Sequence, residues 1–216
     1  MISEESNKQH QKHAKLTRPG LGEFGRDELA IIGTTCANIK NLAAKIINGL
    51  TCKVAYVDAD HKTEARELND NTVLSNGGYF EYTDKITFRR IDFKTDLNIF
   101  QRRMLFNEQD LVLVNGNHFA AKSQIVVVDP VKNLEKKLDK LTDVVLILLK
   151  EKDAIIPDFL QKLPNFHSIP VLSFDDETGI IDFVKSFLAQ KVPALHGLIL
   201  SGGQSSRMKM DKGSLS

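Results

Sequence analysis

The stretch Glu28–Leu50 constrains the fold more than any other part of this 216-residue sequence. It reads ELAIIGTTCANIKNLAAKIINGL, which predicts a buried strand over Leu29–Ile32, a glycine-opened turn over Gly33–Asn38 and then a helix. A strand that enters a helix through a glycine turn is the first half of a βαβ unit. The helix is predicted because apolar residues recur at spacings of three and four, at Ile39, Leu42, Ala43, Ile46, Ile47 and Leu50.

The rest of the chain repeats this alternation of short apolar strands and amphipathic helices. The run VVLILL at Val144–Leu149 is typical of a strand that is buried on both faces of a parallel sheet. A β-hairpin is predicted over Tyr79–Tyr82 and Ile86–Ile91, around a turn at Thr83–Lys85. We therefore expect an α/β fold with a mostly parallel, doubly wound sheet and a β-hairpin insertion. The further predicted strands are Lys53–Val57, Asp110–Val114, Gln124–Val128 and Ile169–Phe174.

Four more segments are predicted to be helical. The first, Leu97–Phe106, is basic and amphipathic, with Leu97, Phe100, Met104 and Leu105 expected to face inward. The others are Val131–Leu141, Pro157–Leu163 and Thr178–Gln190.

The turn after the first strand is half of a phosphate-binding loop. A full loop reads G-x-x-x-x-G-K-[ST], but Asn38 takes the place of the second Gly, Ile39 that of the Lys and Lys40 that of the Ser or Thr. The helix N-terminus could still bind an anion, and the alternative is a plain strand–helix turn. Cys36 could form a thiolate at that N-terminus or simply fill the turn. The residues of this degenerate P-loop are Gly33, Thr34, Thr35, Asn38 and Lys40.

Polar residues with ligand chemistry stand where two predicted strands end. Ligands of doubly wound sheets bind beyond the carboxyl ends of strands, so these residues are a candidate ligand cluster. Their carboxylates and imidazoles would suit a divalent ion, but their side chains need not converge. His118 is a candidate ligand or general base, or else a structural histidine. The cluster comprises Asp58, Asp60 and His61 after one strand, and Asn115 and His118 after another.

Composition excludes several classes of protein. Lys and Arg number 29 against 28 Asp and Glu, so the net charge of +1 indicates no nucleic-acid partner. No apolar run approaches the roughly 18 residues of a membrane span, and the polar N-terminus lacks the apolar segment of a signal peptide. Two cysteines make no disulfide framework, so we expect a reduced, cytoplasmic setting.

The last residues carry the most specific motif. A predicted strand at His196–Leu200 is followed by SGGQSSRMKMDK, which resembles the opening motif of nucleotidyltransferases of the molybdenum cofactor guanylyltransferase type, L-[AS]-G-G-x-S-x-R-M-G-x-D-K. Lys209 stands where that family has Gly. The resemblance implies that Arg207 and Lys212 are catalytic, stabilising charge while GMP passes from GTP to molybdopterin. The implied nucleotide-binding residues are Leu200, Ser201, Gly202, Gly203, Ser205 and Lys212.

Residues 12–190 are similar to the molybdopterin-guanine dinucleotide adaptor proteins, which are a P-loop family. The stretches GTTCANIK, VDADHK, VNGNHF and IPVLSFDD carry this resemblance. The resemblance implies a degenerate P-loop NTPase-like domain at 13–190, and the guanylyltransferase motif implies the first strand and loop of a truncated Rossmann-like transferase domain at 196–216. The charged, polar residues 1–12 predict a loose arm, and Pro193 predicts a linker at 191–195.

Together the two resemblances imply a role in molybdenum cofactor biosynthesis. One reading is a fragment of a guanylyltransferase that uses GTP and Mg²⁺ in its full-length family, with molybdopterin and other cofactor-assembly or acceptor proteins as partners. The sequence ends four residues after Lys212, and we expect a fragment because a predicted strand at His196–Leu200 without neighbouring strands would be exposed. The alternative is a non-catalytic adaptor module of the same pathway that binds a nucleotide or a pterin.

Overall fold

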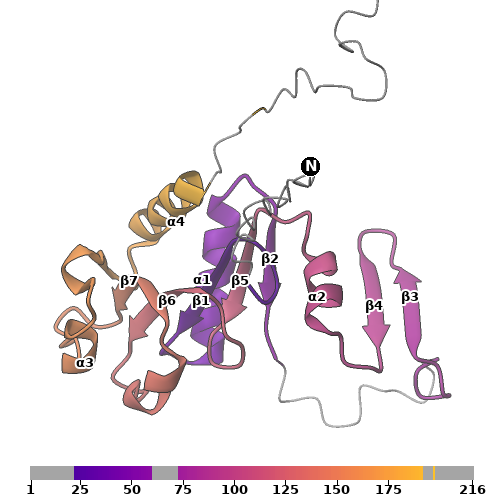
Figure 1. The fold of residues 1–216 in the computed structure, drawn as a ribbon, viewed down its shortest axis with the longest axis horizontal. Helices are drawn as coiled ribbons and strands as arrows, with labels where there is room; N and C mark the ends of the chain where they lie inside the picture. The colour runs from indigo at the N-terminus through magenta and orange to yellow at the C-terminus, as the bar shows by residue number, and fades with distance from the viewer. Residues whose placement is uncertain (1–21, 60–72, 192–196, 198–216) are drawn as a thin grey trace, which may run out of the picture.

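The computed structural model describes residues 22–59, 73–191 and 197. Six parallel strands form the main sheet, and a separate antiparallel pair forms a hairpin (Figure 1). The predicted α/β class, with its parallel sheet and hairpin insertion, is confirmed. Within the described ranges, no helix is both long and apolar enough to cross a membrane. The predicted arm at 1–12 and the predicted strand at His196–Leu200 lie outside these ranges, apart from Gly197.

The strand order places the first strand at the centre of the sheet. The strands are β1 (Glu28–Ile32), β2 (Val54–Val57), β5 (Leu111–Asn115), β6 (Ser123–Val128), β7 (Asp143–Leu149) and β8 (Val171–Ser173). They lie in the order β2-β5-β1-β6-β7-β8. All five residues of β1 are buried, because hydrogen-bonded strands flank it on both sides and other elements cover both faces.

Each face of the sheet has its own core. Helices α1 (Cys36–Gly49) and α4 (Glu177–Lys191) cover one face, where they pack on Leu29 and Ile31 of β1. On the other face, Ile32 of β1 packs in a cluster with Leu160 of α3 (Asp158–Gln161) and Phe166 of η2 (Phe166–Ser168), and with Leu134, which directly precedes η1 (Glu135–Lys140). A further cluster joins Ala30 of β1 to Phe24, Val112 and Val114. The predicted apolar stripe of α1 is largely confirmed, with Ile39, Leu42, Ala43 and Ile46 buried, and α4 buries Ile180, Val184 and Phe187.

Helix α1 begins at Cys36, three residues before the position at which the predicted turn over Gly33–Asn38 would let it begin. Thr35 caps the helix, because its side-chain oxygen accepts a hydrogen bond from the backbone N–H of Asn38 at 3.3 Å. Only Gly33–Thr35 therefore connects β1 to α1. The predicted turn over Gly33–Asn38 is too long, and Asn38 lies in the first turn of the helix.

The hairpin consists of β3 (Phe80–Asp84) and β4 (Arg89–Phe93), and its turn differs from the prediction. Asp84 pairs with Arg89, which moves the turn from Thr83–Lys85 to the residues after Asp84. The Asp84 carboxylate accepts the N–H of Ile86 at 2.8 Å. Ile86 has a positive φ of 69° in this turn, and the bond to Asp84 closes the turn later in the chain than the apolar pattern indicates.

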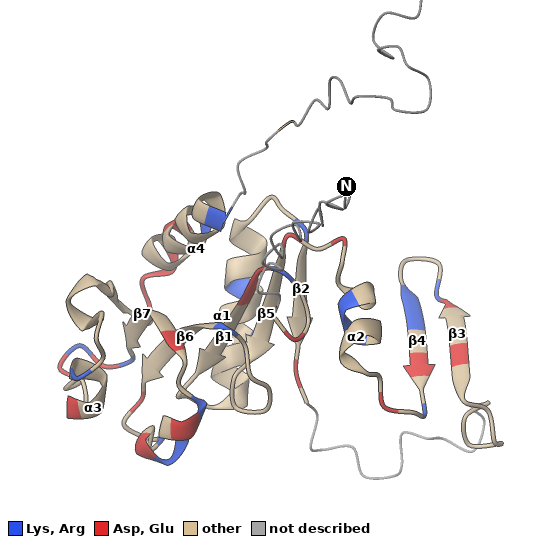
Figure 2. Cartoon of the chain, viewed as in Figure 1, with Lys and Arg blue, Asp and Glu red and all other residues tan. Residues whose placement is uncertain are grey.

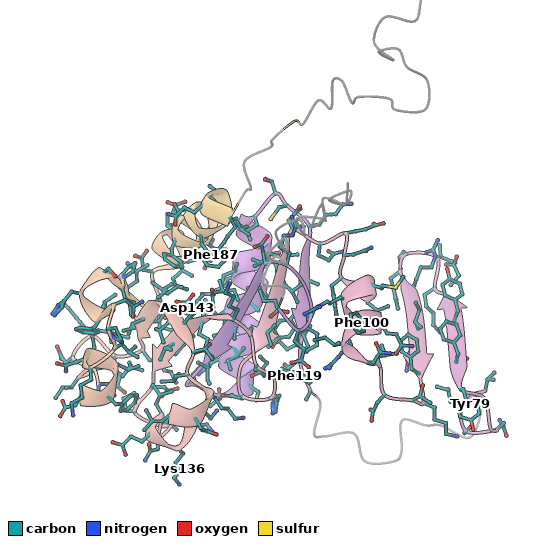
Figure 3. The ribbon with its side chains drawn as sticks, in the orientation of Figure 1. Tyr79, Phe100, Phe119, Lys136, Asp143 and Phe187 are labelled. Atoms are coloured by element: carbon teal, nitrogen blue, oxygen red, sulfur yellow. The ribbon has the colours of Figure 1, made fainter. Side chains whose placement is uncertain are left out.

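Helix α2 (Ile99–Leu105) forms within the predicted range, but the prediction of which of its residues face inward is wrong. Phe100 and Met104 are 71% and 72% exposed, and Tyr79 and Phe100 lie in the part of the molecule that stands away from the main sheet (Figure 3). Arg102 faces the protein instead, pairing with Glu23 at 2.5 Å and lying 5.4 Å from the ring centre of Phe24. A carboxylate and an aromatic face therefore orient this helix. Of the four residues predicted to face inward, Leu97 is half-buried and Leu105 is 47% exposed.

The prediction of a helix over Val131–Leu141 is also wrong. Only the short 3₁₀ helix η1 forms there, and the backbone of Lys137 within it is not helical. Asp129 accepts the N–H of Val131 at 3.0 Å and Asn133 accepts the N–H of Glu135 at 2.8 Å. Such side-chain acceptors hold the backbone in turns and compete with the helix.

Candidate functional site

The carboxyl ends of four adjacent strands bring polar side chains together at one edge of the sheet. This edge is where parallel α/β sheets bind ligands. The turn at Gly33–Thr35 leaves β1, Asp58 follows β2, Asn115 ends β5 and Asp129 follows β6.

Gly33 lets the turn pass directly against β6. Its φ is +101°, and a Cβ added there would lie 2.3 Å from the backbone oxygen of Val127. No L side chain fits at that distance from a backbone atom. The close passage places Thr34, which is fully buried, beside Asp129.

Asp129 is the buried anchor of the site. One carboxylate oxygen accepts hydrogen bonds from the Thr34 hydroxyl at 2.5 Å and from the Lys150 ammonium at 2.8 Å. The other oxygen accepts the N–H of Val131 at 3.0 Å. Burial opposes ionisation of this side chain, but the bonds from Lys150, Thr34 and Val131 outweigh it and lower the pKa of Asp129.

The side chains of two asparagines donate hydrogen bonds to the turn. The Asn38 side-chain amide donates to the Thr34 hydroxyl at 2.9 Å, and the Asn117 side-chain amide donates to the Thr34 carbonyl at 2.9 Å. Asn117 is held in turn by Lys137, which bonds its side-chain oxygen, and by Lys140, which bonds its carbonyl at 3.1 Å. Burial and the nearby charge of Lys140 lower the pKa of Lys137.

A second polar cluster joins β2, β5 and the start of α1. Asp58 accepts hydrogen bonds from the Tyr56 hydroxyl and the Asn115 amide, both at 2.7 Å. The Nε2 atom of His118 lies 4.0 Å from an Asp58 oxygen and 3.2 Å from the Cys36 sulfur. Burial, together with the hydrogen bond to Asp58 and the charges of Asp58 and Cys36, raises the pKa of Tyr56.

These residues do not fit a magnesium ion held as P-loop proteins hold it. Donors already occupy both carboxylates, since Asp58 accepts from Tyr56 and Asn115 and Asp129 from Lys150. Lys40, which takes the place of the magnesium-binding Ser or Thr, is an exposed cation. Over the ranges that the structure describes, no group of three or more His, Cys, Asp or Glu residues could hold a metal.

The structure brings together most of the predicted site residues that it describes. Gly33, Thr34, Thr35 and Asn38 form the turn and the start of α1, while Asp58, Asn115 and His118 form the second cluster. Asp60, His61 and the predicted transferase residues lie outside the described ranges; the latter are Leu200, Ser201, Gly202, Gly203, Ser205, Arg207 and Lys212.

Sequence reasoning missed several residues of the site. Asp129 follows the buried run QIVVV, so the rule about strand ends that selected Asp58 could have found it. Asn117, Lys137 and Lys150 carry no such signal, because they reach the turn only through the tertiary fold.

A cleft of about 700 Å³ lies next to Asp129, lined by residues from 128–135 and 151–159. A cavity of about 720 Å³ lies at the opposite edge, near Asp27 and Asp110, which directly precede β1 and β5. Burial raises the pKa of Asp27, although Lys191 and Arg26 oppose the shift. Because ligands of parallel sheets bind at the carboxyl ends of strands, the edge with Asp129 is the candidate site.

Comparisons with known proteins show which fold this is. No family model and no curated protein matches the chain. It is similar to the crystal structure of molybdopterin-guanine biosynthesis protein B (mobB), with 17% identity and a TM-score of 0.50, over 75% of this chain and 99% of that one. Two structures of Bacillus subtilis MobB match at 13% and 15% identity with TM-scores of 0.52 and 0.54. They cover 74% of this chain and 95% and 96% of theirs. The described domain therefore has the α/β fold of the MobB structures.

Proposed function

We propose that residues 13–190 form a non-catalytic binding module of molybdenum cofactor biosynthesis. The module would hold a phosphate-bearing nucleotide or pterin at the carboxyl edge of the sheet. The fold of the MobB structures supports this pathway, as does the resemblance of residues 200–212 to the guanylyltransferase motif.

The observation that carries the non-catalytic assignment is the position of Ile39. Ile39 takes the place of the P-loop lysine, and its side chain is fully buried in the core between α1 and the sheet. A phosphate-binding lysine is therefore replaced by a core residue. The turn before it is short and held by Asp129, Asn38 and Asn117. Phosphoryl transfer depends on a positioned lysine and a metal ion, and this turn offers neither.

The same edge can still bind an anion. The N-terminus of α1 presents backbone N–H groups at Cys36 and Ala37, which favour negative charge. Lys137 and Lys140 come from the segment between β6 and β7, where Figure 2 shows basic and acidic residues interleaved. Charges on an exposed edge are screened by salt, so binding should be weak and salt-sensitive.

Titration with GTP and with molybdopterin tests the module. We expect calorimetric binding that weakens as salt rises, with no phosphate released from GTP. Lys137→Met and Lys40→Ala should each weaken binding several-fold. Lys136→Met is the matched control, because Lys136 is an exposed neighbour (Figure 3). No binding of either ligand, or an equal effect of all three variants, would refute this site.

A second candidate function rests on the transferase motif. We propose that Leu200, Ser201, Gly202, Gly203, Ser205 and Lys212 bind GTP in a guanylyltransferase, with Arg207 and Lys212 as its catalytic groups. The motif match in the sequence favours this. The test is metal-dependent release of pyrophosphate from GTP in the presence of molybdopterin. Release by this chain that Lys212→Ala abolishes would make the chain an enzyme through residues 200–212, whereas release that survives Lys212→Ala would contradict the role assigned to this motif.

A further inference from the structure

Cys36 has a histidine beside it that comes from a distant part of the chain. Cys36 is the first residue of α1, and its thiol is exposed. Its sulfur lies 3.2 Å from Nε2 of His118, whose side chain is 15% exposed. A thiol that solvent can reach, with a largely buried base in contact with it, is the arrangement of an activated cysteine nucleophile.

The surroundings of this pair can stabilise the charges that develop when the thiol proton moves to the imidazole. The N-terminus of α1 stabilises negative charge on Cys36, and the side-chain amide of Asn117 lies 3.6 Å from the sulfur. Asp58, 4.0 Å from Nε2, would stabilise positive charge on His118. Among the described residues, further titratable groups that act on this cluster are Tyr56, which bonds Asp58, and Lys137 and Lys140, which both bond Asn117.

We propose that Cys36 is a modification site that undergoes thiol–disulfide exchange with small disulfides, and that His118 is its base. His118 takes the thiol proton at Nε2, and the thiolate attacks one sulfur of the disulfide. A bond forms between that sulfur and Sγ of Cys36, the original S–S bond breaks, and the second half leaves as a thiolate that the imidazolium can protonate. The step needs no reactant other than the disulfide, and it does not depend on which ligand the edge of the sheet binds.

The other cysteine is a built-in comparison. The sequence has two cysteines, and Cys52 lies at the opposite edge, where it lines the cavity that also contains Asp27 and Asp110. The same cavity is also lined by the basic Arg26, Arg103 and Lys191, so Cys52 differs from Cys36 in lying away from His118 and from the N-terminus of α1. The two thiols therefore differ in the features that the proposal invokes.

The experiment measures exchange with bis(2-hydroxyethyl) disulfide, which is neutral and so is not attracted by Lys137 or Lys140. Single-thiol variants Cys52→Ser and Cys36→Ser are followed by mass spectrometry at pH 6.5, both folded and in urea. The rate in urea is the reference rate of each thiol in the unfolded chain, with which its rate in the folded protein is compared. An ordinary thiol is about 1% ionised at this pH. Removal of the proton by a base can therefore raise the rate by up to about 100-fold, and the lower nucleophilicity of a stabilised thiolate reduces this gain to about tenfold.

We expect folded Cys36 to react about tenfold faster than in urea, and folded Cys52 to react no faster than in urea. His118→Gln in the Cys52→Ser background should remove most of the Cys36 acceleration with an unchanged circular dichroism spectrum. His167→Gln, a distant histidine on η2, should leave it intact. Cys36 that reacts no faster folded than unfolded, or acceleration that survives His118→Gln, would overturn the proposal.

Discussion

Gly33→Ala tests the contact between the turn and β6, on which the whole site depends. The substitution has two costs. The new Cβ would stand 2.3 Å from the backbone oxygen of Val127 and 3.1 Å from a methyl of Leu134, and an alanine would have to adopt a φ of +101°. Gly77→Ala is the control that has only the backbone cost, because the φ of Gly77 is +98° and a Cβ there would meet nothing within 4 Å.

The expected magnitudes follow from this geometry. A positive φ costs an L residue about 1–2 kcal/mol, while replacing Gly by Ala restricts the unfolded chain and returns about 0.4–1 kcal/mol. Gly77→Ala should therefore cost about 1 kcal/mol. Crowding of a packed backbone adds about 1–3 kcal/mol, so Gly33→Ala should lower the free energy of unfolding by about 3 kcal/mol.

The assay is urea denaturation of each variant, followed by far-UV circular dichroism at equal protein concentration. The difference between the two variants, about 2 kcal/mol, measures the close passage of the turn against β6. Gly33→Ala that costs no more than Gly77→Ala would refute the reasoning, because the turn would then have room for a side chain. That result would also contradict the close position of Thr34 beside Asp129, which depends on the approach of the turn to β6.

Three further predictions follow. Asp129 has a lowered pKa, so it stabilises the fold above its unfolded value near 3.9. That contribution is lost as the pH falls through its lower folded value, and Asp129→Asn should flatten the decline of stability below about pH 4 in urea titrations. Met104→Lys, on the exposed face of α2, should change the free energy of unfolding by no more than about 0.5 kcal/mol; a loss above that would mean that this face is covered in solution. Asn98→Ala removes the capping box of α2 and should destabilise that helix by about 1 kcal/mol; unchanged hydrogen exchange across 99–105 would contradict the cap.

The local pattern of the sequence was enough to predict much of the fold. The apolar spacing of α1 predicted its buried face, because residues three and four apart share one side of a helix wherever the helix lies. The run VVLILL predicted a strand covered on both faces for the same kind of reason. The rule about strand ends placed Asp58, Asn115 and His118 in one candidate site, since parallel strands end at a common edge.

Local patterns could not predict which partner each segment meets. Helix α2 is amphipathic, yet its apolar Phe100 and Met104 are exposed. The side of the helix that contacts the protein is the one with Arg102, which pairs with Glu23 and lies over the ring of Phe24. Asp129 and Asn133 bond their own neighbouring backbone and break a helix that the pattern favoured.

The sequence by itself therefore determined the parallel α/β sheet, the buried strands and the apolar Ile39 at the position where a phosphate-binding loop has its lysine. Only the tertiary structure decided what surrounds the turn. The order β2-β5-β1-β6 brings Asp58 and His118 to one side of it and Asp129 to the other, and Lys150 reaches Asp129 from the end of β7. Cys36 and His118 are 82 residues apart. A sequence pattern reports spacing along the chain, whereas such contacts depend on which strands pair across it.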